Sequence, residues 1–71
     1  MSKLEKVIEI VARETGTPAD SLNAATRLHS LGMDSLDFIS LLRSIESEFD
    51  CTIADADYPN LQTIGDIAER V

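Results

Sequence analysis

Apolar residues recur at helical spacing in three separate stretches of this 71-residue chain. The first stretch predicts a helix over Lys3–Glu14. Ser2 precedes it and Glu5 lies three residues further on, which is the pattern of a capping box. Gly16 follows, and glycine is common just past a helix end. The predicted apolar face comprises Leu4, Val7, Ile8 and Val11.

The second stretch predicts a helix over Ser35–Phe49. Asp34 is suited to the N-cap position, because its carboxylate can accept from the free N–H groups of the first turn. Asp37 lies in that turn, where negative charge suits the helix dipole. The predicted core face comprises Phe38, Leu42, Ile45 and Phe49, with Leu41 at its edge. The opposite face comprises Leu36, Ile39, Ser40, Arg43 and Ser47.

Between these helices, residues 17–33 show no sustained periodicity and are expected to form a long loop. Ser21 and Leu22 fit a short helical turn after Pro18, and Leu28 and Leu31 are spaced as further anchors onto a core. A loop of this length is uncommon in a small domain and is often functional.

The third stretch predicts a last helix capped by Thr63, with Asp66 three residues on and an apolar stripe of Ile64, Ile67, Ala68 and Val71. Before it, Asp55–Tyr58 is expected to form a short helix ended by Pro59. We therefore expect one all-α domain over residues 1–71. It is a small four-helix bundle with three main helices, a short third helix and a long loop between the first two.

The net charge of −7 lies entirely in residues 28–71, which hold nine acids and two bases, Arg43 and Arg70. This field repels nucleic acid and anionic lipid and attracts basic protein surfaces, although an acidic surface also serves solubility alone. No run of 18 apolar residues and no signal-peptide pattern is present, so we expect a cytoplasmic protein without a membrane span. The single cysteine, Cys51, excludes an internal disulfide, and no metal site is expected.

Ser35 is the candidate for covalent chemistry, at the start of the second helix. A catalytic serine needs a base and a pocket, and the only histidine is His29, six residues earlier. No glycine-rich oxyanion loop is present, so we expect no catalytic residue and no enzyme activity. An ordinary first-turn serine is the competing interpretation.

The residues around Ser35 favour a site of covalent chemistry over an ordinary first-turn serine. Leu31-Gly32-Met33-Asp34-Ser35-Leu36, then Asp37 and an apolar register to Phe49, resembles the attachment motif of the acyl carrier protein family over nearly the whole chain. The resemblance implies that a phosphopantetheinyl transferase moves 4′-phosphopantetheine from coenzyme A onto Ser35. The terminal thiol of that arm then carries acyl groups as thioesters.

The resemblance also implies that partner enzymes recognise the second helix through basic docking patches. These partners include ligases or synthases that load acyl or aminoacyl groups. Asp34 is expected to cap the helix and to aid transferase recognition through cationic groups or magnesium. We expect a monomer. The expected partner-binding residues are Met33, Leu36, Asp37, Ile39, Ser40, Arg43 and Glu46.

Three residues depart from the pattern of fatty-acid carriers: Ser40 where an acid is common, Arg43 where an apolar residue is typical, and Phe38 where smaller residues are common. They favour a stand-alone carrier for a specialised pathway with polyketide-like, modified-lipid or aminoacyl cargo. A housekeeping fatty-acid carrier ranks second. A non-ribosomal peptide carrier module fits less well, because such modules usually lack the aspartate before the serine. From another functional class, the alternative is an acidic interaction module without a prosthetic group, docking through Leu36 and Ile39.

Overall fold

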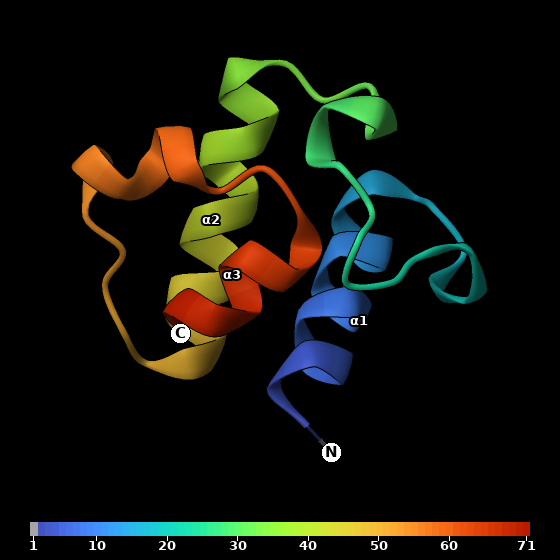
Figure 1. Ribbon diagram of the computed structural model, residues 1–71, viewed down its shortest axis with the longest axis horizontal. Helices are drawn as coiled ribbons and strands as arrows, with labels where there is room; N and C mark the ends of the chain where they lie inside the picture. Colours follow the sequence, from blue (N-terminus) through green and yellow to red (C-terminus); the bar gives the residue numbers. More distant parts are fainter. Residues whose placement is uncertain (1) are drawn as a thin grey trace.

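The computed structural model describes residues 2–71, and their regular secondary structure is helical apart from one isolated β-bridge. Figure 1 shows α1 and α2 running side by side in opposite directions, and α3 packs against α1. The all-α prediction is therefore confirmed. None of the helices formed by residues 2–71 is long and apolar enough to cross a membrane. In chain order the elements are α1 (Lys3–Thr15), η1 (Ala19–Ser21), η2 (Leu28–Leu31), α2 (Ser35–Phe49), η3 (Asp55–Asn60) and α3 (Ile64–Arg70), where η denotes a 3₁₀ helix.

Both ends of α1 are capped by the residues that the sequence predicts. The Ser2 Oγ accepts from the Glu5 N–H at 3.1 Å, and the Glu5 carboxylate accepts from the Ser2 N–H at 3.2 Å, which completes the predicted capping box. Gly16 ends the helix in the left-handed conformation, with φ of 71°. Glycine adopts this conformation without the steric cost that a Cβ brings.

A second capping box starts α3. The Thr63 Oγ1 accepts from the Asp66 N–H at 3.1 Å. The Asp66 Oδ2 accepts from the N–H groups of Gln62 and Thr63 at 3.0 and 3.1 Å. These backbone hydrogen bonds favour the charged carboxylate, so they hold the pKa of Asp66 below its usual value.

The core forms where α1 packs on α2 and α3. Leu41 is fully buried rather than at the edge of the apolar face, whereas Phe38 and Phe49 are only half-buried. Both phenylalanines lie near the ends of α2, where fewer elements cover them. Ile39, expected on the outward face, is also half-buried. The buried core residues are Val7, Ile10, Val11, Leu22, Leu28, Leu41, Leu42, Ile45, Ile53, Leu61, Ile64 and Ile67.

The long loop is held against the start of α3 by backbone hydrogen bonds. They run from Ile64 N to Thr26 O (3.1 Å), from Gly65 N to Ala24 O (2.9 Å) and from Leu28 N to Gln62 O (2.9 Å). The loop thus supplies acceptors for N–H groups that a helix start leaves free. Burial of Leu22 and Leu28 adds apolar anchoring, as the sequence predicted.

One short element was not predicted, and one predicted boundary was wrong. The loop contains a 3₁₀ turn, η2, that the absence of periodicity concealed. Pro59 does not end the short helix, because η3 continues through it to Asn60. The second turn of η3 is closed by a bond from Leu61 N to Tyr58 O, and Pro59 follows the accepting residue. Proline is favoured at that turn position, where its missing N–H costs no hydrogen bond.

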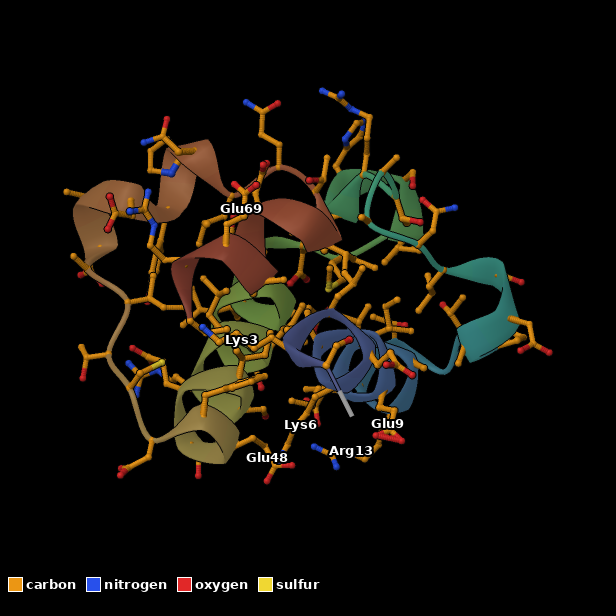
Figure 2. The ribbon with its side chains drawn as sticks, turned by 60° about the horizontal axis from the view of Figure 1, so that its bottom comes forward. Lys3, Lys6, Glu9, Arg13, Glu48 and Glu69 are labelled. Carbon is orange, nitrogen blue, oxygen red and sulfur yellow. The ribbon has the colours of Figure 1, made fainter. Side chains whose placement is uncertain are left out.

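The end of the molecule away from Ser35 is tied together by lysines of α1. Lys3 Nζ donates to the carbonyl oxygen of Val71 at 2.7 Å, and Figure 2 shows its side chain reaching toward the end of α3. Lys6 Nζ lies 5.7 Å from the centre of the Phe49 ring. This cation–π contact partly covers a phenylalanine that the core leaves half-buried.

Candidate functional site

The site is built on the first turn of α2. Asp34 has extended backbone geometry, and its Oδ1 accepts from the Asp37 N–H at 2.9 Å. Its carbonyl oxygen accepts from the Phe38 N–H at 3.0 Å. Asp34 is therefore the N-cap, as predicted. The N–H groups of Ser35 and Leu36 are the first two of the helix and have no partner within it.

Ser35 is the first residue of α2, and its side chain is exposed. In the part of the chain described, from residue 2 onward, no hydrogen bond holds its hydroxyl. The chain reaches it through η2 and Gly32, which has a φ of 75°. This left-handed residue turns the chain out of η2 just before the helix. The result is a free hydroxyl on a backbone that the Asp34 cap fixes.

A groove of about 500 Å³ opens beside Ser35. Its walls come from η2, the first turns of α2, η3 and the segment before α3, so elements far apart in the sequence line one groove. Arg27, Gln62 and Leu61 were not singled out from the sequence, because only the contact between the loop and α3 brings them to Ser35. The lining residues are Arg27, Leu28, His29, Met33, Asp34, Ser35, Phe38, Tyr58, Leu61 and Gln62.

Phe38 and Tyr58 form an edge-to-face aromatic pair in this groove, with ring centres 6.1 Å apart and planes at 85°. The pair joins α2 to η3, so Tyr58 packs the short element onto the bundle. Burial raises the pKa of the Tyr58 phenol, and the charge of Asp55 adds to the effect. The phenol is thus neutral near pH 7, with a hydroxyl available as a hydrogen-bond donor.

The polar rim of the groove holds three nitrogen-bearing side chains. Arg27 Nη2 donates to Gln62 Oε1 at 3.2 Å, which fixes the guanidinium near the mouth. His29 is exposed and lines the same groove, so the structure brings the only histidine close to the serine. The groove can therefore accept a ligand with both apolar and polar parts.

Four of the seven predicted partner-binding residues are exposed, and the other three are half-buried. Leu36 is 77% exposed, and Asp37, Ser40 and Arg43 are also exposed. Glu46, in contrast, is half-buried, and its Oε2 accepts from the Ile53 N–H at 2.6 Å. This carboxylate holds the connector that follows α2. Met33 and Ile39 are half-buried at the margins of the face.

The described chain, residues 2–71, contains no group of three or more His, Cys, Asp or Glu side chains placed to hold a metal ion. Cys51 is a half-buried free thiol in the connector after α2.

The arrangement at Ser35 offers an accessible hydroxyl, free helix N–H groups and an adjoining groove. These features suit modification of the serine by another enzyme.

Comparison with known proteins agrees with this geometry. A family model described as the phosphopantetheine attachment site matches residues 5–71. The acyl carrier protein of Bdellovibrio bacteriovorus is 39% identical over 64 residues, which cover 89% of this chain and 82% of that protein.

Proposed function

The chain belongs to the acyl carrier protein family, and on that premise we propose that Ser35 is the residue to which 4′-phosphopantetheine is attached. Members of this family are carriers rather than catalysts, and 4′-phosphopantetheine is their prosthetic group. The observation that carries the assignment is the position of Ser35. It is an exposed serine at the first position of α2, beside a groove of about 500 Å³.

The residues present fit a phosphodiester on the Ser35 hydroxyl. The free N–H groups of Ser35 and Leu36 point along the dipole that favours an anion at a helix start. The adjoining groove offers Gln62 and Tyr58 as hydrogen-bonding partners and Leu61 as an apolar wall. When bound, the arm supplies a thiol that forms thioesters with acyl groups.

Asp34 and Asp37 have a different task, because their charges repel a phosphate. Asp34 caps the helix and fixes the backbone that presents Ser35. Both carboxylates are exposed, so they remain open to cationic groups or a magnesium ion on the phosphopantetheinyl transferase. We assign them to transferase recognition.

The outward face of α2 is the proposed surface for acyl- or aminoacyl-loading enzymes. Leu36 is its most exposed apolar residue and lies one position after Ser35. Basic partner groups would face Asp37, next to it. Glu46 contributes less, because its carboxylate is already bound to the Ile53 N–H. The full proposed set is Met33, Leu36, Asp37, Ile39, Ser40, Arg43 and Glu46.

The cargo we propose is short, polar or aminoacyl, in a specialised pathway. Phe38 and Tyr58 meet edge to face where a chain would enter between α2 and η3. Their rings occupy space that a long alkyl chain needs. Core chemical shifts should therefore change little between the free-thiol arm and an octanoyl arm. Large chain-dependent shifts would instead support the housekeeping fatty-acid carrier.

Peptide mapping tests the attachment site directly. Cleavage after Arg27 and Arg43 gives a peptide of residues 28–43, which holds Ser30, Ser35 and Ser40. After reaction with coenzyme A and a broad-specificity transferase, fragmentation should place the added mass on Ser35. Mass on Ser30 or Ser40 would refute the assignment.

The interaction-module alternative rests on the exposure of Leu36. It predicts that Ser35→Ala leaves partner binding and function intact, whereas the carrier proposal predicts complete loss of function with the fold retained.

We further propose that the chain acts as a single-domain cytoplasmic monomer. Its −7 net charge, which disfavours self-association, supports the monomer.

A further inference from the structure

We propose that an open groove between α1 and α2 is a docking subsite for a carboxylate side chain of a partner protein. The groove has a volume of about 380 Å³ and lies away from the groove beside Ser35. The groove shares Ser40 and Arg43 with the proposed docking face of α2, so the proposal rests on that face but not on the prosthetic group. The lining residues are Arg13, Ser40, Arg43, Ser44, Ser47 and Glu48.

Arg43 is the first observation. Residues 28–71 hold nine acids and only two bases, Arg43 and Arg70. Arg70 is paired with Asp57, at 3.5 Å between Nη2 and Oδ1. Arg43 is exposed and, across residues 2–71, takes part in neither of the two ion pairs. The acidic half of the molecule therefore presents one unpaired guanidinium, at the centre of the outward face of α2.

Arg13 reaches the same groove from α1. Its only ion pair in the described chain is with its neighbour Glu14, at 3.8 Å, and its side chain is 60% exposed. An exposed pair at this distance contributes little. Figure 2 shows Arg13 and Glu48 projecting from α1 and α2 toward the same side of the molecule. Glu48 forms no ion pair with either arginine within residues 2–71.

The lining residues make the groove suitable for an anion. Two arginines and one glutamate give it a formal charge of +1 on a protein of −7. Guanidinium groups bind carboxylates through two parallel hydrogen bonds, which makes arginine selective for planar anions. Ser40, Ser44 and Ser47 add hydroxyls along one side of α2, and each can donate to a carboxylate oxygen.

The position of the groove defines the partner surface. Arg43 follows Ser35 by eight residues, about 12 Å along the helix. A partner aligned on α2 would therefore place basic groups against Asp34 and Asp37, an apolar pocket over Leu36, and a carboxylate against Arg43. A uniformly basic partner surface would be repelled at Arg43. Among partners with basic groups facing Asp34 and Asp37, the groove thus favours those that also place a carboxylate against Arg43.

The test is an NMR titration of the full ¹⁵N-labelled chain with two capped amphipathic helical peptides. The peptides differ only in their polar face, which carries glutamates in one and lysines in the other. The glutamate peptide should shift the Nε–H signals of Arg13 and Arg43 and the amides of Ser40, Ser44 and Ser47. The lysine peptide should shift the amides around Asp37 instead.

Matched variants sharpen the result. Arg43→Gln should weaken binding of the glutamate peptide by about threefold or more, the size expected for an exposed charge pair. Arg70→Gln removes a base paired elsewhere and should change the affinity less than twofold. Equal weakening in both variants would overturn the proposal, because it would indicate only general charge attraction. Absence of shifts at millimolar peptide would overturn it too, as would identical shifts with inorganic phosphate.

Discussion

Replacing Gly65 with alanine tests how tightly the long loop is joined to α3. In an open helix the change Gly→Ala stabilises by about 0.5–1 kcal/mol. Gly65 occupies the second position of α3, where a Cβ would lie 3.0 Å from the Ala24 carbonyl oxygen and 3.3 Å from the Ala24 Cβ. Both distances are shorter than ordinary van der Waals contact. The usual gain should therefore become a loss.

The size of the loss follows from the contacts involved. The oxygen that the new Cβ would crowd also accepts the Gly65 N–H at 2.9 Å, so relief of the clash stretches a hydrogen bond between loop and helix. Overpacking of this kind costs about 1–3 kcal/mol. With the middle of each range, about 2 kcal/mol of cost less about 0.75 kcal/mol of helix gain, we expect about 1 kcal/mol of destabilisation. In a domain of this size that corresponds to a fall in Tm of roughly 4–8 °C.

Circular dichroism, with thermal and urea unfolding of both proteins, measures this change. Gly16→Ala serves as a control, because nothing lies within 4 Å of a Cβ there and only its φ of 71° opposes the substitution. That variant should lose about 1 kcal/mol through backbone strain alone. A Gly65→Ala protein as stable as the wild type, or more stable, would refute the close contact between the loop and α3.

Three further outcomes follow from the hydrogen bonds. Asp34→Ala should lower the free energy of unfolding by about 1 kcal/mol, measured by urea unfolding, and Asp34→Asn by less, since asparagine also caps; equal losses would contradict the capping role. Glu46→Ala should cost about 1–3 kcal/mol by leaving the Ile53 N–H without its acceptor, and unchanged stability would show that this bond is not needed. The lowered pKa of Asp66 contributes stability that is present above its unfolded value and lost as pH falls below about 4. Asp66→Asn should therefore flatten the acid limb of the Tm–pH curve, and an unchanged limb would contradict this.

Local sequence signals predicted the helices well, because each main helix carries its own boundaries. Ser2 with Glu5 and Thr63 with Asp66 form the capping boxes that their spacing indicates. Asp34 caps α2 as expected. These signals act over three or four residues, so no tertiary information is needed to read them.

Features that depend on tertiary contact were not predictable in the same way. Arg27 and Gln62 reach the groove beside Ser35 only because the loop is hydrogen-bonded to the start of α3. Glu46 lies on a face that periodicity leaves open to partners, yet the connector after α2 folds back onto its carboxylate. Periodicity also gives no measure of coverage at helix ends, which is why Phe38 was expected deeper in the core.

The most direct test of the central claim is the intact mass of the protein before and after incubation with coenzyme A, magnesium and a broad-specificity phosphopantetheinyl transferase. The Ser35→Ala variant, shown to be folded by circular dichroism, is treated in parallel. The account predicts one added arm on the wild type and none on the variant. An arm on the variant would contradict the assignment of Ser35. No arm on a folded, initially unmodified wild type, with a known carrier modified alongside, would contradict the carrier function itself.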